Sequence, residues 1–231
     1  MILTSSLVHP GFKPEGRRLR RLDLAGPVGR IEAILDEGSA DAPLAALVCH
    51  PHPQSGGTMR NKVVYHAMKV LNAPEWGLRL PVLRFNFRGA GLSAGQHDGL
   101  AEAEDVGAAL DWLESEYARP IVVAGFSFGA VMALRACCCR PRAVRAVAAL
   151  GLPASVGYRR YDYNFLSGCT LAKLFLSGTC DPFAPEEQLT QITAAAADPK
   201  QLVLLPGADH FFTGQLPRMQ QALAGWLHEE L

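Results

Sequence analysis

The sequence predicts an α/β fold, in which a mostly parallel β-sheet is covered by helices on both faces. Short apolar runs such as residues 121–125 (IVVAG) alternate along the chain with amphipathic segments such as residues 101–117. Strands buried on both faces read as continuous apolar runs, whereas a helix packed on a sheet keeps one polar face. The alternation therefore indicates parallel strands joined by crossover helices.

An antiparallel hairpin is expected ahead of this alternating pattern. Residues 18–24 and 30–35 read as two strands around the turn-forming sequence GPVG at 26–29. No aromatic residue interleaves the arginines of the first strand, so we interpret them as the solvated protection of an edge strand rather than as an anion or nucleic-acid site. These arginines are Arg17, Arg18, Arg20 and Arg21.

The later elements are recognised by the period of their apolar residues. Residues 59–71 follow a helical period, residues 101–117 carry acidic residues between apolar ones, and a last helix presents an apolar stripe from Leu216 to Leu227. The expected inner strands are the apolar runs at 44–50, 80–87, 121–125, 146–150, 171–177 and 201–206.

The composition fits one globular domain, which we expect to span residues 1–231. Hydrophobic residues make up 49% of the chain, and no repeat, low-complexity tract or linker interrupts it. Lys plus Arg and Asp plus Glu both number 22, so the charge balance favours neither a nucleic acid nor an anionic membrane as a partner. The sequence predicts no particular oligomeric state.

A cytoplasmic protein with reduced thiols is expected. The N-terminal segment has no charged region followed by an apolar run long enough for a signal peptide or a spanning helix. Cys137, Cys138 and Cys139 are consecutive, so they point in different directions on a helix, and the chain has no CxxC pair. We therefore interpret the cysteines as small hydrophobic residues, and expect neither a disulfide framework nor a zinc site.

A candidate nucleophile lies in the G-x-S-x-G sequence at residues 125–129, between an apolar strand and a helix that begins at about Phe128. A serine on such a sharp turn has a strained backbone, and side chains two residues away on either side would collide with it. The turn lifts the hydroxyl toward the helix start, where backbone N–H groups favour an anion. We predict that Ser127 is catalytic; a purely structural turn is the alternative.

A candidate acid and base follow in the order required by this arrangement. Asp181 follows the strand at 171–177, and His210 follows the strand at 201–206, so both loops leave the sheet at the edge that carries Ser127. A neutral imidazole takes the serine proton, and a carboxylate on its other nitrogen fixes the tautomer. Asp209 is a rival acid, but its adjacency to His210 favours a turn-capping role.

Six motifs, in order over roughly residues 20–228, resemble the small bacterial α/β-hydrolases related to dienelactone hydrolase. The resemblance implies an α/β-hydrolase fold without a large cap, no cofactor, and activity on esters or related acyl compounds. The nucleophile of dienelactone hydrolase is a cysteine, so the serine at 127 argues against a dienelactone substrate. The motifs are HPHP (50–53), GGTM (56–59), NKVV (61–64), LRFNFRG (83–89), GFSFG (125–129) and GADHFF (207–212).

An acyl-transfer site also needs two hydrogen-bond donors for the developing oxyanion. The backbone N–H of Phe128 is the first. The prolines of the turn at 50–53 have no N–H, which leaves His52 or Gln54 as the second. The similarity of this turn to the H-G-x-P turn of other α/β-hydrolases favours His52. A metal site built from His50 and His52 is the alternative, but no third ligand lies nearby.

Aromatic residues are expected to line the substrate pocket. Residues 152–168 follow the strand after which many relatives insert a lid, and only a short loop fits there. Its aromatic side chains, like those beside the triad, either line the pocket or pack the loop down. The candidates are Phe126, Phe183 and Phe211 beside the triad and Tyr158, Tyr161, Tyr163 and Phe165 in the loop, with Gln54 as a polar candidate.

These observations lead to a serine hydrolase that cleaves a carboxylic ester of a small molecule through an acyl-enzyme. The alternatives are a peptidase or thioesterase that uses the same triad, and a non-catalytic small-molecule-binding protein of the same fold.

Overall fold

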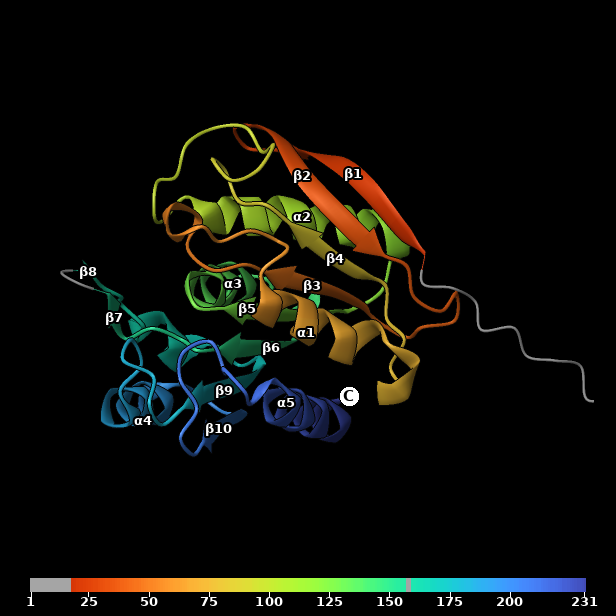
Figure 1. The fold of residues 1–231 in the computed structure, drawn as a ribbon. Coiled ribbons are helices and arrows are strands. Elements are labelled where there is room, and N and C mark those ends of the chain that lie inside the picture. Colours follow the sequence, from red (N-terminus) through yellow and green to blue (C-terminus); the bar gives the residue numbers. More distant parts are fainter. Residues whose placement is uncertain (1–17, 157–158) are drawn as a thin grey trace, which may run out of the picture.

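An eight-stranded sheet forms the centre of the structure, a computed structural model that describes residues 18–156 and 159–231. Only β1 and β2 at one end run antiparallel to their neighbours; every other pairing is parallel (Figure 1). The strands, in the order in which they lie side by side, are β1 (Leu19–Gly26), β2 (Gly29–Asp36), β4 (Val82–Phe85), β3 (Ala45–Cys49), β5 (Ile121–Phe126), β6 (Val144–Leu150), β9 (Ala172–Gly178) and β10 (Lys200–Leu205).

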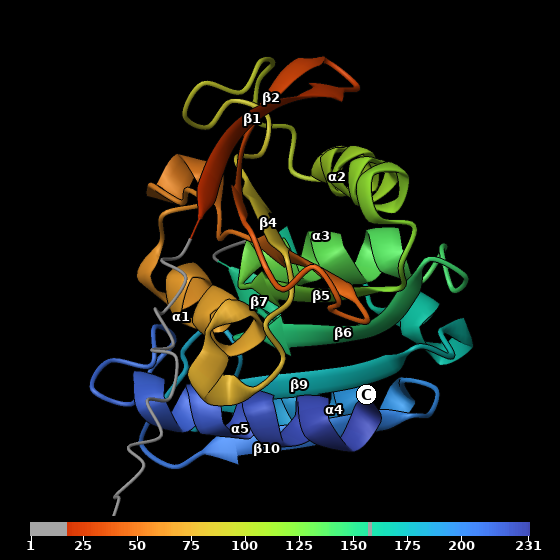
Figure 2. The same cartoon turned by 90° about the vertical axis from the view of Figure 1, so that its right-hand side faces the viewer.

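Helices cover both faces of this sheet, which confirms the predicted fold class (Figure 2). Residues of α2, α3 and α4 share one apolar cluster, and residues of α1 and α5 share the other. Across the two described stretches, none of the helices combines the length and the apolar character needed to cross a membrane. The helices are α1 (Lys62–Asn72), α2 (Glu102–Tyr117), α3 (Phe128–Cys137), α4 (Glu186–Ala195) and α5 (Leu216–Glu230).

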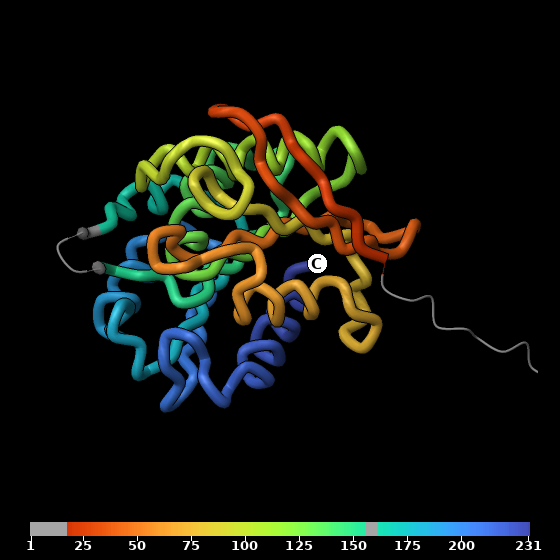
Figure 3. Tube along the Cα trace, turned by 45° about the horizontal axis from the view of Figure 1, so that its top comes forward, coloured from red at the N-terminus to blue at the C-terminus, as the bar shows by residue number. Residues whose placement is uncertain are grey.

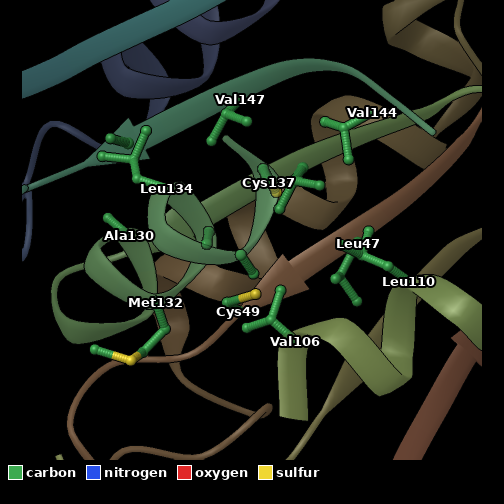
Figure 4. Close-up of a cluster of buried hydrophobic side chains, with 14 of the residues drawn as sticks. Leu47, Cys49, Val106, Leu110, Ala130, Met132, Leu134, Cys137, Val144 and Val147 are labelled. Atoms are coloured by element: carbon green, nitrogen blue, oxygen red, sulfur yellow. The ribbon is translucent and has the colours of Figure 1, made fainter. Parts of the chain in front are cut away.

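The central strand β5 explains why the inner strands read as continuous apolar runs. Successive side chains of a strand point to opposite faces. Ile121 and Val123 therefore enter the cluster under α2 and α3, whereas Val122 and Ala124 enter the cluster under α1 and α5. Figure 4 shows part of the first cluster, where side chains of α2 and α3 meet those of β3 and β6.

The N-terminal hairpin is confirmed as the antiparallel edge of the sheet. Arg20 on β1 forms exposed ion pairs with Glu37 (3.8 Å) and Glu116 (3.4 Å), as expected for a solvated edge strand. Arg17 lies outside the described residues.

The segment between β6 and β9 is short, and it contains more structure than the loop expected there. Two short strands, β7 (Ser155–Val156) and β8 (Arg159–Arg160), form a hairpin that is followed by a 3₁₀ turn at Asn164–Gly168. No large cap is built from the described part of this segment.

The expectation that all cysteines are reduced is wrong for one pair. Cys138 and Cys169 form a disulfide between the end of α3 and the residues before β9, with a Cα–Cα distance of 5.2 Å. The two residues are 31 positions apart, so the sequence spacing gave no sign that they meet. Cys49 and Cys137 do behave as small hydrophobic residues: both are buried and free, and burial raises the pKa of each thiol.

A buried histidine joins the end of β3 to the chain beyond β4. Nδ1 of His50 lies 2.6 Å from the carbonyl oxygen of Pro51, so it carries the ring proton, and Nε2 accepts the backbone N–H of Phe87 at 2.9 Å. Burial lowers the pKa of His50 to about 4, against the smaller opposing effect of the hydrogen bond to Pro51. The folded protein therefore holds this imidazole neutral.

The pH dependence of stability tests whether the folded protein keeps His50 neutral. The unfolded chain protonates His50 near its ordinary pKa of 6.5, whereas the folded chain does so only at about 4. Between these values the unfolded state binds more protons, so stability is lost as the pH falls through this window. By pH 4, His50 should have lowered the free energy of unfolding by about 3 kcal/mol relative to neutral pH. We expect urea unfolding of a His50→Gln variant to show a shallower loss between pH 7 and 4; equal losses would contradict the prediction.

Candidate active site

Ser127 lies in the sharp turn between β5 and α3. Its φ of 56° and ψ of −122° place it in a strained region of backbone space. A Cβ on Gly125 would lie 2.4 Å from the carbonyl oxygen of Gly129, and a Cβ on Gly129 would lie 2.4 Å from that of His50. Close backbone approach therefore requires both glycines. Gly125 meets the serine turn itself, as predicted, whereas Gly129 meets the end of β3, which the sequence did not indicate.

The neighbouring strand holds this turn in place. The backbone N–H of Ser127 donates to the carbonyl oxygen of Leu150 at the end of β6, at 2.8 Å. Phe128 begins α3, so its backbone N–H lies in the first turn of the helix, where N–H groups have no acceptor within the helix. The Ser127 side chain thus lies at the positive end of a helix dipole.

A continuous chain of hydrogen-bonding groups joins Ser127, His210 and Asp181. Nε2 of His210 lies 3.0 Å from Oγ of Ser127, and its Nδ1 lies 2.7 Å from Oδ2 of Asp181. The side chains of His210 and Asp181 are only 6% and 0% exposed. The structure therefore brings together the three residues that the chain order predicted.

Local hydrogen bonds fix the Asp181 carboxylate behind the imidazole. It follows β9 and accepts the Ser177 hydroxyl at 3.1 Å and the backbone N–H of Phe183 at 2.9 Å. With the carboxylate held against Nδ1, the ring proton belongs on that nitrogen, and the lone pair of Nε2 faces the serine.

Asp209 takes a different position, although it adjoins His210. Its Oδ1 accepts the backbone N–H groups of Phe211 (3.1 Å) and Thr213 (2.8 Å). The hydrogen bond from the Thr213 backbone is the main reason that the pKa of this carboxyl is lowered. Asp209 therefore caps the turn after β10, as interpreted from the sequence.

The turn after β3 folds tightly beside the first turn of α3. The backbone N–H groups of Ser55 and Gly57 both donate to the carbonyl oxygen of His52, at 3.1 and 3.0 Å. A Cβ on Gly57 would lie 2.1 Å from the carbonyl oxygen of Pro51, so only glycine fits there. The His52 ring lies 5.1 Å from that of Phe128, which brings the two predicted oxyanion donors into neighbouring positions.

A cavity of about 580 Å³ opens beside Ser127 and His210. Tyr161, Phe183 and Phe211 form an aromatic wall, as expected. A second, polar wall belongs to the turn after β3 and the start of α1; of this wall only His52 and Gln54 were predicted to line the site. The further lining residues are Pro51, Ser55, Gly56, Gly57 and Asn61, and all but Ser55 belong to the motifs HPHP, GGTM and NKVV, which indicated the family but not this role.

Three other aromatic candidates do not line this cavity. Phe126 is fully buried, because strand alternation turns it into the core, where its ring packs 5.0 Å from that of His210. Tyr163 is buried and its hydroxyl donates to the carbonyl oxygen of Pro153, and Phe165 lies under the guanidinium of Arg135. Tyr158 lies outside the described residues.

The alternative of a metal site at His50 and His52 finds no support in the geometry. Both ring nitrogens of His50 are already engaged, by Pro51 and Phe87. Within residues 18–156 and 159–231, no three His, Cys, Asp or Glu side chains are grouped to hold a metal ion.

The chain is similar to known proteins over most of its length. Residues 79–223 match the family model described as an alpha/beta hydrolase domain. An uncharacterized protein of Rickettsia prowazekii is 34% identical over 210 residues, which cover 87% of this chain and 86% of that protein.

Solved structures agree with this match. A serine hydrolase without a lid from Xanthomonas campestris shares 31% identity with a TM-score of 0.81, over 96% of this chain and 98% of its own. Dienelactone hydrolase from Anabaena variabilis has the same fold at 18% identity, with a TM-score of 0.75 over 93% and 99% of the two chains. These findings confirm the resemblance drawn from the motifs: the chain belongs to the α/β-hydrolase family.

Proposed function

We propose that the protein is a carboxylesterase in which Ser127 is the nucleophile, His210 the general base and Asp181 the residue that orients it. The observation that carries this proposal is the chain of contacts, 3.0 Å from Ser127 to His210 and 2.7 Å from His210 to Asp181, beside a cavity that Ser127 and His210 line. Such a chain activates a serine for acyl transfer.

The reaction then proceeds in two halves. Oγ of Ser127 attacks the ester carbonyl carbon while its proton passes to Nε2 of His210, and the carbonyl electron pair moves onto the oxygen. Collapse of this intermediate breaks the bond to the alcohol oxygen, which takes the proton from His210. Water repeats the sequence on the acyl-enzyme, releases the carboxylic acid and returns the proton to Ser127.

Two backbone N–H groups stabilise the oxyanion in this scheme, those of Phe128 and His52. The Phe128 group has no acceptor within α3 and lies at the positive end of the helix dipole. The packing of the His52 turn against Phe128 supports the second assignment over Gln54, which lines the cavity farther along that turn. Preorganised donors of this kind act without reorganisation during the reaction.

A neutral ester with a short acyl chain fits this cavity best. The side chains that line it include no Lys, Arg, Asp or Glu among the described residues. A substrate carboxylate would therefore be desolvated there without a counter-ion. The described residues between β6 and β9 build no large cap over the cavity, so CH₂ groups that extend beyond its aromatic wall would gain no apolar contact.

The Ser127→Ala variant tests the nucleophile. It removes one oxygen atom, so we expect the thermal unfolding midpoint to change little while hydrolysis of p-nitrophenyl acetate is lost. A fluorophosphonate probe should label the parent protein and leave the variant unlabelled, because only an activated serine reacts. Labelling of the variant, or turnover above a few per cent of the parent rate, would remove Ser127 from the mechanism.

A matched pair of variants tests the acid. Asp181→Asn should lower kcat on the order of 10³- to 10⁴-fold, because the amide presents its N–H₂ to the imidazole and favours the wrong tautomer; this range follows the known effect of that change in a serine protease. Asp209→Asn keeps an oxygen for its two backbone donors and should cost far less. The reverse order of losses would identify Asp209 as the acid.

Substrate series test the cavity. Across p-nitrophenyl esters of increasing acyl length, kcat/KM should level off or fall after the short chains, since each CH₂ gains its ~0.8 kcal/mol only when buried.

A pair of substrates tests the charge preference. The p-nitrophenyl ester of a dicarboxylic acid whose second carboxyl is a methyl ester should be cleaved about tenfold faster than the same p-nitrophenyl ester whose second carboxyl is free. A thioester or anilide of the same acid, cleaved faster than the ester, would favour a thioesterase or peptidase instead.

A further inference from the structure

A second histidine–carboxylate pair lies behind the proposed oxyanion hole. Nδ1 of His97, in the loop between β4 and α2, is 2.7 Å from Oε1 of Glu102. The two side chains are 6% and 0% exposed, the same fractions as those of His210 and Asp181. Neither residue takes part in the proposed triad. Burial of a carboxylate costs free energy unless hydrogen bonds or ion pairs compensate for the lost water.

Glu102 closes the loop that carries His97 onto the start of α2. Its two carboxylate oxygens also accept the backbone N–H groups of Asp98 and Gly99, both at 2.8 Å. A negative charge in the first turn of α2 is favoured by the helix dipole as well. The carboxylate is therefore fixed, and its Oε1 lies in close contact with His97 without a hydrogen bond, since neither ring nitrogen of His97 has a hydrogen-bond partner within residues 18–156 and 159–231.

The ring of His97 contacts both residues that we assign as oxyanion donors. Its centroid lies 4.4 Å from that of His52 and 5.4 Å from that of Phe128. In Figure 3 the orange turn after β3 runs beside the yellow-green loop that carries His97. The three rings come from three separate segments and close a triangle, because His52 and Phe128 also touch each other.

Attachment of the loop to α2 does not by itself account for this pair. Arg88, at the start of the same loop, already binds Asp105 of α2 through contacts of 2.7 to 3.1 Å, and both of these side chains are buried. Besides accepting the two backbone N–H groups, Glu102 places a carboxylate against the imidazole that contacts the turn of His52.

We propose that His97, packed between Glu102 and the ring of His52, is a positioning residue that fixes the His52 turn against Phe128, so that the two backbone N–H groups converge on the oxyanion. This inference rests on the proposed esterase function. Groups that orient a donor from behind matter because small displacements of a preorganised site reduce transition-state stabilisation.

The kinetic test uses His97→Ala with p-nitrophenyl acetate. Removal of the ring leaves the His52 turn without its contact on this side, so we expect kcat to fall about 10- to 100-fold. This decrease is at most comparable to that caused by the loss of one oxyanion donor. KM should change less than about threefold, because the interaction matters mainly in the transition state. A rise in KM with unchanged kcat would overturn the proposal.

The affinity for a boronic acid is a second measurement. It should stay at the parent value if His97 only stabilises the fold. Oγ of Ser127 bonds to the trigonal boron, its proton passes to Nε2 of His210, and one hydroxyl of the tetrahedral boronate occupies the oxyanion position. We expect the Kd of phenylboronic acid to weaken in His97→Ala by the factor lost in kcat, whereas the Kd of the product acetate stays within about threefold. Unchanged boronate affinity beside a reduced kcat would overturn the proposal.

A double-mutant cycle tests the role of Glu102. Glu102→Gln should lower kcat less than His97→Ala does, and the double variant should be no slower than His97→Ala alone, because Glu102 acts through His97. Additive losses would overturn this link. If His97→Ala does not fold, His97→Asn, which can keep a donor near Glu102 but lacks the ring, is measured in its place with the same expectations.

Asn72→Ala is the matched control for loss of stability. Asn72 ends α1 at the opposite edge of the sheet and donates to the carbonyl oxygens of Asp36, Glu37 and Leu80. This variant should lower the unfolding midpoint while kcat and boronate affinity stay at parent values.

A parent protein that neither cleaves esters nor reacts with fluorophosphonate would refute the proposed function. An active parent whose His97 variants keep full kcat would refute the positioning role alone.

Discussion

The close approach of the first turn of α3 to the end of β3 is the constraint on which the rest of the site depends. Gly129 lies so near the carbonyl oxygen of His50 that no side chain fits between them. Beside this contact Ser127 has a strained backbone with positive φ. The contact with β3 and the hydrogen bond from the Ser127 backbone to Leu150 together place Ser127 and the start of α3 next to the turn of His52.

Three imidazoles of this site are almost fully buried, and each has a different neighbour at Nδ1. Asp181 and the carbonyl oxygen of Pro51 are hydrogen-bonded to His210 and His50, whereas Glu102 contacts His97 at 2.7 Å without a hydrogen bond. The partner determines the chemistry. A carboxylate can stabilise an imidazolium, whereas a carbonyl in a dry site leaves His50 neutral and purely structural.

The meeting of Ser127, Asp181 and His210 could be predicted from the sequence because topology alone brings these residues together. Ser127, Asp181 and His210 each follow an apolar run, and the carboxyl ends of parallel strands share one edge, so no knowledge of side-chain packing was needed. The same reasoning explains why the edge hairpin and the order of strands and helices could be read from apolar periods.

What the sequence could not show depends on contacts between distant segments or on the choice of a strand face. The Cys138–Cys169 disulfide joins elements with no shared pattern. Phe126 ends a strand that is apolar on both faces, so a continuous run could not tell that its ring points into the core. The pairing of His97 with Glu102 was hidden because the stretch around His97 reads as an ordinary polar loop.

The two walls of the cavity have different origins in the chain. The polar wall comes from one continuous stretch that joins β3 to α1, whereas the aromatic wall is assembled from loops that follow β6, β9 and β10. None of the residues that form these two walls lies in a strand of the sheet. Over evolution, one wall can therefore be exchanged by a single local insertion or replacement while the other is retained, which gives this scaffold a simple route to new substrates without rebuilding its core.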